Sequence, residues 1–112
     1  MLGYKRQVFS EDQIVSSAAG KESIMFRLWG KIWKDNHLLK DTVYEEESED
    51  TRTHKVFKGL EAICYELDLG VPVWLDSNIQ EFQRHTKVRF HQDSFIEQIE
   101  FDFLELEVIK EG

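Results

Sequence analysis

Cysteine is almost absent from this chain of 112 residues, because Cys64 is the only one. A single thiol cannot form an intramolecular disulfide, and it cannot supply the several thiolates of a cysteine-rich zinc site. Cys64 also falls on the apolar side of a predicted helix, so we expect a buried structural thiol rather than a nucleophile.

Long apolar runs are missing as well. No stretch approaches the ~20 residues that cross a bilayer, and the N-terminal segment has charge but no continuous apolar region of the kind found in signal peptides. Together with the single cysteine, these absences predict a cytoplasmic protein that does not contact a membrane.

Glycine is scarce and catalytic motifs are lacking. The six glycines are not clustered, so a loop that cradles phosphate is not expected, and there is no GxGxxG, Walker loop, HExxH, GxSxG or CxxC. His85, His91 and Asp93 have the composition of a two-His-one-carboxylate site, but any histidine pair near an aspartate would qualify. We therefore expect a non-enzymatic protein with no cofactor and no metal, while acid–base catalysis by the abundant carboxylates stays open.

Positive charge is outnumbered, with 14 Lys and Arg against 22 Asp and Glu and a net charge of −8. Residues 1–34 carry a net charge of +3 and residues 35–112 a net charge of −11. An acidic region is repelled by nucleic acid, whose binding depends largely on neutralising phosphates. Nucleic acid is thus a disfavoured partner, whereas proteins and small molecules are compatible with this charge.

The pattern of the chain predicts one domain at residues 25–112, preceded by a partly ordered extension at residues 1–24. Apolar residues alternate from Met25, which indicates a strand, and a turn at 34–37 leads to a second strand at about 38–45. Five carboxylates follow within residues 45–50, and we interpret them as a solvated loop before a helix, with a metal or basic-partner site as the alternative.

Three-and-four spacing predicts a helix at about 52–68, with Gly70 in the left-handed position after it. Residues 71–75 are predicted to form a short strand, and a second helix follows with Asp76 or Ser77 as its N-cap. KVRF (87–90) and residues 95–112 are predicted strands. A switch of apolar face at 103/104 suggests a β-bulge or a change of packing environment. The fold class is therefore α+β: a mainly antiparallel sheet of four to five strands, in the order ββαβαββ, with a long helix packed on one face.

Two tryptophans share one face of the first strand. Trp29 and Trp33 are four residues apart and point away from Phe26, Leu28 and Ile32. An indole pair on a sheet face is typical of an interface, because Trp and Tyr dominate interface energetics. The alternative is that a helix or the N-terminal extension covers both rings within one subunit.

The basic residues gather in RHTKVRFH, residues 84–91. Lys87, Arg89 and His91 share one strand face, and the last strand offers Glu100, Asp102, Glu105 and Glu107. If the two strands pair, these opposite charges line up, which is our preferred interpretation. Alternatively, the cluster binds an anion or single-stranded nucleic acid, with the tryptophans as stacking platforms. The candidate residues for that role are Arg84, His85, Lys87, Arg89 and His91.

The segments WGKIWKDN, THKVFKGLE and VPVWLDSNIQEFQRHTK make residues 25–112 resemble small uncharacterised bacterial proteins. This resemblance implies no activity and no site residues. Our hypothesis from the sequence is a small cytoplasmic interaction or regulatory module that self-associates, as a homodimer or with a protein partner, through the face that bears Trp29 and Trp33 or through a strand edge. The alternative is the anion or single-stranded nucleic-acid module of residues 84–91.

Overall fold

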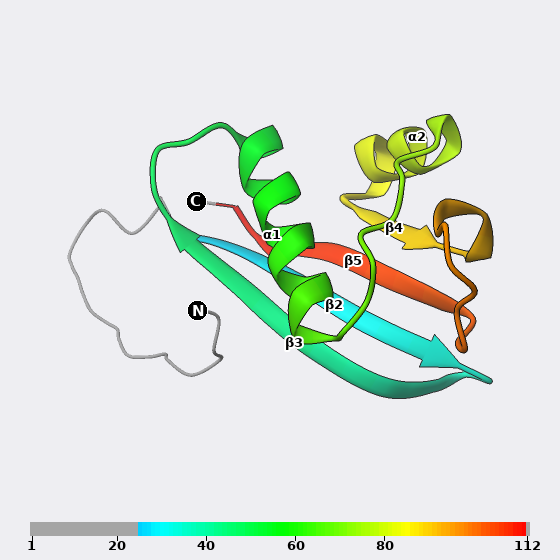
Figure 1. Ribbon diagram of the computed structural model, residues 1–112. Coiled ribbons are helices and arrows are strands. Elements are labelled where there is room, and N and C mark those ends of the chain that lie inside the picture. The colour runs from blue at the N-terminus through cyan, green and yellow to red at the C-terminus, as the bar shows by residue number, and fades with distance from the viewer. Residues whose placement is uncertain (1–24, 112) are drawn as a thin grey trace.

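A four-stranded antiparallel sheet carries two α-helices on one side (Figure 1). The computed structural model describes residues 25–111. The sheet has the strand order β3-β2-β5-β4, so the central strands are β2 and β5. The elements are β2 (Met25–Lys34), β3 (His37–Glu47), α1 (Arg52–Glu66), α2 (Asp76–His85), β4 (Lys87–Phe90), a single 3₁₀ turn (Gln92–Ser94) and β5 (Phe103–Lys110).

The predicted α+β class and antiparallel sheet are confirmed, but the predicted order of elements is wrong in detail. Within residues 25–111 the order is ββααββ, with four strands. Residues 71–75 are extended without pairing in the sheet, and Val73 makes a single backbone hydrogen bond to Ser94 at 2.7 Å. The helix predicted at 52–68 ends at Glu66 and has 15 residues. The predicted extension at residues 1–24 lies outside the described residues.

The last strand is shorter than its sequence suggests. Residues 95–102 are irregular, and pairing with β2 and β4 begins only at Phe103 and Leu104. The change of apolar face at 103/104 therefore marks the start of the strand and not a bulge. The register of the β2–β5 pair shifts elsewhere, between Arg27 and Leu28.

The two-residue alternation of β2 is confirmed. Phe26, Leu28 and Ile32 are buried on the side that faces the helices. Leu104 and Leu106 of β5 lie opposite Ile32 and Gly30 in the register and are completely buried. Because successive side chains of a strand point to opposite faces, Trp29 and Trp33 lie on the other side of the sheet, as predicted.

Helix α1 packs its apolar stripe against β2 and β3. Its buried residues Val56, Leu60 and Ile63 follow the predicted spacing, and Cys64 is fully buried among them. Gly59 lies at the contact, where an added Cβ would stand 2.6 Å from Leu28 Cδ2 and 2.8 Å from Tyr44 Cδ2. The absence of a side chain at this position lets the helix approach the sheet closely.

Both helix-end predictions need correction. After α1 the left-handed residue is Asp68, with φ of 62°, and not Gly70. The N-cap of α2 is Leu75, and not Asp76 or Ser77. The Asn78 side chain accepts a hydrogen bond from the Leu75 amide at 3.0 Å. Asn78 also accepts from Ser94 Oγ at 2.9 Å and donates to the Arg89 carbonyl at 3.3 Å. This buried amide thus ties α2 to β4 and to the 3₁₀ turn.

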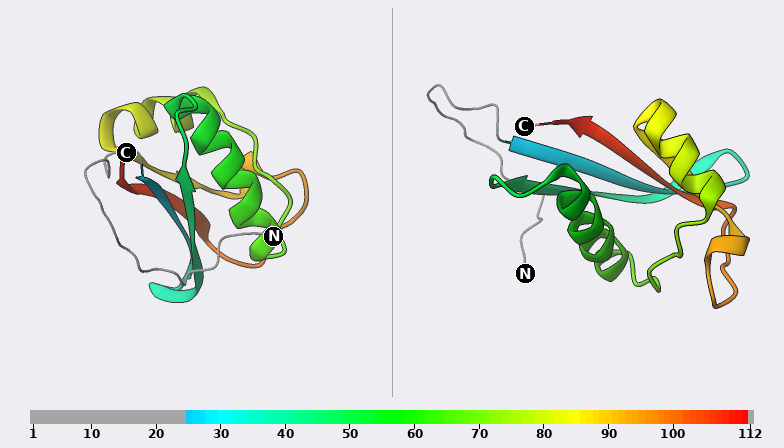
Figure 2. Two further views of the ribbon diagram at one scale, coloured as in Figure 1. Left: turned by 90° about the vertical axis from the view of Figure 1, so that its left-hand side faces the viewer. Right: turned by 90° about the horizontal axis from the view of Figure 1, so that it is seen from above.

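The helices cover the same face of the sheet but different strands. Helix α1 lies over β2 and β3, whereas α2 lies over β4, and Figure 2 shows the two helices at different places along the sheet. Residues 67–75 run between them, and Trp74 packs edge-on against Phe82 and Phe90. Among the described residues, no helix is long and apolar enough to cross a membrane.

Replacing Gly59 by alanine should destabilise the protein. In a helix interior this change ordinarily stabilises by about 1 kcal/mol, but here the new methyl group would collide with Leu28 and Tyr44. Overpacking of this kind costs about 1–3 kcal/mol, so we expect urea unfolding to show a net loss of stability. The exposed Glu61→Ala on the same helix serves as the control and should change stability by at most about 0.5 kcal/mol. A more stable Gly59→Ala protein would show that the contact is looser than described.

Candidate functional site

The face of the sheet opposite the helices is the first candidate site. Alternate residues of all four strands point to it, and none of the described helices lies over it (Figure 2). We call this surface the open face. Its residues are Met25, Arg27, Trp29, Lys31 and Trp33 of β2, Leu38, Asp41, Val43, Glu45 and Glu47 of β3, Phe103, Glu105, Glu107 and Lys110 of β5, and Lys87 and Arg89 of β4.

A buried ion pair occupies the centre of the open face. Lys31 and Glu105 are neighbours on the two central strands, and their exposed fractions are only 7% and 4%. Lys31 Nζ lies 3.2 Å from Glu105 Oε1 and 2.9 Å from Glu107 Oε1. The second oxygen of Glu105 lies 3.2 Å from Arg89 Nε. The two most buried charges on this face therefore compensate each other.

The two indoles contact this pair in different ways. Trp33 donates its Nε1–H to Glu105 Oε1 at 3.1 Å. Trp29 donates to Asp41 Oδ2 at 2.9 Å, and the Lys31 ammonium lies 4.0 Å from the centre of the Trp29 ring, in cation–π geometry. Both tryptophans are only partly buried. They shield the ion pair from water and present ring surface outward.

Burial and its partners act in opposite directions on Glu105. Desolvation favours the neutral acid, but hydrogen bonds from Lys31, Arg89 and Trp33 and the charge of Lys31 favour the carboxylate, so the net pKa of Glu105 is lowered. Glu105 is therefore a charged structural group, and its pKa shift is opposite to that of a general acid held protonated at neutral pH.

The structure divides the basic cluster of residues 84–91 between two surfaces. Lys87 and Arg89 lie on the open face, in register with Glu107 and Glu105, as the strand-pairing interpretation predicts. Arg84 and His85 lie exposed in the last turn of α2, above the opposite face. The exposed His91 has its ring 5.4 Å from that of Phe103. The five residues therefore do not converge on one anion site.

Two other acids that precede the last strand have different partners. The Glu100 carbonyl accepts a hydrogen bond from Lys34 Nζ at 3.2 Å, and Asp102 Oδ2 accepts one from the Asp35 amide at 2.9 Å. These contacts hold residues 100–102 against the β2–β3 turn. They leave Glu105 and Glu107 as the acids that face the basic strand β4.

The acidic segment at residues 45–50 is engaged with α1. Lys58 Nζ lies 2.8 Å from Glu46 Oε2 and 3.1 Å from Asp50 Oδ2, and Asp50 Oδ1 lies 3.0 Å from His54 Nδ1. Hydrogen bonds from His54 and Lys58 lower the pKa of Asp50 to about 2. Burial and the hydrogen bond to Glu46 raise the pKa of Tyr44 to about 12. These contacts link the segment to the helix. The solvated-loop interpretation is wrong for residues 45–47, which form the end of β3, and the Glu46 side chain is only 10% exposed.

Neither the histidines nor the cysteine forms a reactive constellation. Within residues 25–111 no three His, Cys, Asp or Glu side chains are grouped so that they could hold a metal ion. Burial raises the pKa of the Cys64 thiol to about 12, so it is protonated at neutral pH and a poor nucleophile.

A second candidate site lies on the helical side, where α1 and α2 leave a groove beside Trp74. Sequence reasoning missed both this groove and the central role of Lys31. The sequence did contain a signal for Lys31. It alternates with Trp29 and Trp33 on one face of its strand, and Glu105 and Glu107 alternate in the same way on the last strand. No short sequence pattern predicts the groove, because the groove depends on the distance between two helices.

Comparison with known proteins does not extend these observations, because no family model, no curated protein and no solved structure matches this chain.

Removing Glu105 should be costly. Glu105→Ala leaves Lys31 buried with Glu107 as its remaining partner, and breaking a buried pair typically costs about 3–5 kcal/mol. Because Glu107 stays in place, we expect the lower end, about 3 kcal/mol, in urea unfolding. Arg89→Ala is the matched control, since half of that side chain is exposed and exposed ion pairs contribute at most about 1 kcal/mol. Equal losses for the two variants would refute a buried, central role for Glu105.

Acid should weaken the protein partly through Asp50. Its pKa is about 2 in the folded protein and about 3.9 in an unfolded chain, so its contribution is complete above about pH 5 and is lost as the pH falls through 4 towards 2. We expect Asp50→Asn to flatten the fall in unfolding free energy over this range. Glu49→Gln is the control, because Glu49 is exposed and makes no ion pair with the described residues. An unchanged pH profile in Asp50→Asn would contradict the assignment.

Proposed function

We propose that this protein is a non-enzymatic interaction module that self-associates through the open face. The observation that carries the proposal is the pair of partly exposed indoles, Trp29 and Trp33, on a sheet face that no described helix covers. Rigid aromatic rings bury large areas at low entropic cost and are enriched at the centres of interfaces. Val43 and Phe103 add apolar surface beside them.

Charge balance supports a second copy of this chain as the partner. The open face carries five cations and five anions, so its net charge is zero. The cations are Arg27, Lys31, Lys87, Arg89 and Lys110, and the anions are Asp41, Glu45, Glu47, Glu105 and Glu107. The whole chain has a net charge of −8. Two copies would repel each other least when they meet through a neutral surface. A symmetric dimer places the same patch on both subunits, which requires such self-complementarity.

The free edge of β3 supports association less well. Leu38 and Leu39 are about half exposed there, but Lys40, Asp41 and residues 45–47 make much of the strand charged. Charges on an edge strand are a common protection against edge-to-edge pairing. We therefore favour the face over the edge as the interface.

The alternative function, binding of an anion or single-stranded nucleic acid, is disfavoured by the ion pairs. Arg89 is engaged with Glu105, and Lys87 lies opposite Glu107. A phosphate approaching these cations would meet two carboxylates. Salt-dependent binding of a mixed-sequence oligonucleotide, lost on mutation of Lys87 and Arg89, would instead support this alternative.

A cytoplasmic location is part of the proposal. It is supported by the single cysteine, which lies buried and unpaired in the core. Disulfides are typical of secreted domains of this size.

Self-association is tested by sedimentation or by light scattering after size exclusion, over a range of protein concentrations. We expect a concentration-dependent dimer. Trp29→Ala/Trp33→Ala should weaken the dimer by at least about tenfold, because truncation of a central aromatic residue often costs 2 kcal/mol or more. Circular dichroism of each variant establishes that it is folded.

Two matched variants separate the face from other surfaces. Tyr65→Ala removes an aromatic side chain that is 81% exposed on α1, and it should leave the dimer intact. Leu39→Lys adds charge at the β3 edge and should also have little effect. A wild-type protein that stays monomeric at every concentration would rule out self-association, and a dimer lost only in Leu39→Lys would move the interface to the edge.

A further inference from the structure

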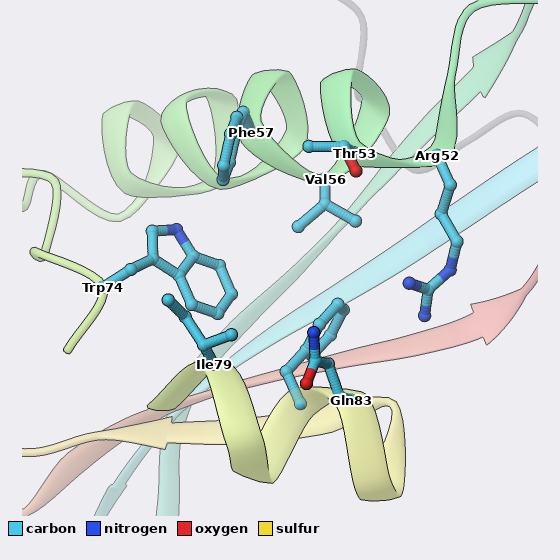
Figure 3. Close-up of a pocket in the computed structure, with 8 residues that line it drawn as sticks. Arg52, Thr53, Val56, Phe57, Trp74, Ile79 and Gln83 are labelled. Carbon is cyan, nitrogen blue, oxygen red and sulfur yellow. The ribbon is translucent and has the colours of Figure 1, made fainter. Parts of the chain in front are cut away.

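A cavity of about 240 Å³ lies between α1 and α2, on the side of the sheet opposite the open face (Figure 3). Val56 and Phe57 of α1 form one wall, Ile79 of α2 lies on the other, and Trp74 closes one end. Phe82 of α2 also lines the cavity. The lining is therefore mainly apolar. Phe57 and Ile79 are 49% and 40% exposed, so the groove opens to solvent between them.

Aromatic packing holds the groove in shape. The Trp74 ring meets Phe82 and Phe90 edge-on, with centroids 5.6 Å and 5.0 Å apart, and lies tilted against Phe57 at 6.2 Å. Phe90 and Phe82 are themselves buried in the core. Because three ring contacts already fix the Trp74 side chain, a ligand would not have to order it, and the entropy cost of binding is lower.

A cation stands at the other end of the groove. Figure 3 shows Arg52 reaching from the start of α1 towards α2. Its guanidinium carbon lies 5.1 Å from the centre of the Phe82 ring. Only its Nε is engaged among the described residues, by Glu111 Oε1 at 3.0 Å. Both side chains of this pair are about half exposed, so the pair is weak. Arg52 is also the first residue of α1, where the helix dipole favours an anion.

The groove contains an unpaired donor as well. Trp74 Nε1 is buried and has no hydrogen-bond partner among the described residues. Figure 3 shows this nitrogen on the edge of the indole nearer Phe57 and α1. A buried donor without a partner costs about 1–3 kcal/mol. This donor lies at the end of the groove away from Arg52.

We propose that the groove binds a small amphipathic carboxylate, with its apolar body between Phe57, Trp74 and Ile79 and its anionic end at Arg52. The volume lies below the ~300–1,000 Å³ of sites for drug-sized ligands, which favours a ligand with a single ring or a short alkyl chain over a segment of polypeptide. Arginine selects the carboxylate, because its planar terminal nitrogens match the two oxygens.

This inference is independent of self-association, because the groove and the open face lie on opposite sides of the sheet. Failure of one proposal leaves the other in place. Self-association is measured by oligomeric state, whereas binding in the groove is measured by ligand titration.

The test follows Trp74 directly. In the full chain with Trp29→Phe/Trp33→Phe, Trp74 is the only remaining tryptophan, so its indole N–H gives a single assigned signal in ¹H–¹⁵N spectra. We expect 3-phenylpropionate or octanoate to shift this signal saturably. The tighter-binding of the two acids shows whether the groove prefers an aromatic or an aliphatic ligand body. The neutral 3-phenylpropanamide should bind at least about tenfold more weakly, since hydrogen bonds to charged groups contribute about 1.5–3 kcal/mol.

Two substitutions should move the carboxylate affinity in opposite directions. Arg52→Gln should weaken binding at least about tenfold. Glu111→Gln should strengthen it, because it removes the carboxylate that competes for Arg52. Both residues are exposed, so neither change threatens the fold.

Further variants separate the apolar body from the charge. Ile79→Ser should weaken the carboxylate and the amide alike, whereas Ile96→Ser, at a residue 95% exposed and outside the groove, should change neither. Equal affinities of carboxylate and amide, or no effect of Arg52→Gln, would overturn the assignment of the anion to Arg52. Groove signals that move only with protein concentration would overturn the proposal, since the groove would then be a contact between copies.

Discussion

The rest of this structure depends on the buried ion pair between Lys31 and Glu105. Two charges with exposed fractions of 7% and 4% are tolerable only when they are mutually paired and further hydrogen-bonded, because an isolated buried charge costs several kcal/mol. Glu107, Arg89 and Trp33 supply those contacts. Each of these partners is in place only if β2, β5 and β4 pair in a single register. These ion pairs and hydrogen bonds on the open face therefore select the register in which β2, β5 and β4 pair, whatever they contribute to net stability.

The opposite face is governed by packing. Gly30 and Gly59 mark the points where α1 approaches the sheet too closely for a side chain, against Ile63 in one case and against Leu28 and Tyr44 in the other. Helix α1 is thus held over β2 and β3, while Asn78 holds α2 over β4. The groove is the space that results between two helices fixed to different strands. The shape of the groove follows from the contacts that hold each helix on the sheet. Arg52 and Trp74 at its two ends supply its polar groups.

Much of the sheet is predictable because its signals are local. The alternation of β2, the spacing of Val56, Leu60 and Ile63, and the KVRF strand all identify their elements, and opposite charges at matching parity predict the pairing of β4 with β5. Residues 71–75 and 95–102 mislead because apolar residues there pack as irregular segments. Phe95 and Phe101 meet edge-on at 5.9 Å outside any strand. Trp74, Arg52 and Lys31 acquire their roles only from tertiary contacts, which no short window of sequence contains.

The two faces differ in what they can recognise, and the difference follows from where charge is compensated. On the open face each of the two buried charges has an internal partner. The exposed remainder carries aromatic rings and charges that balance, which suits a surface of the same kind. In the groove the one cation, Arg52, has only a half-exposed terminal partner in Glu111, and the walls are apolar. A site of that composition suits a ligand that brings its own single negative charge. An acidic chain can therefore carry an anion site without a basic patch, because one poorly compensated arginine in an apolar groove is a stronger local attractor than several cations already paired on a sheet.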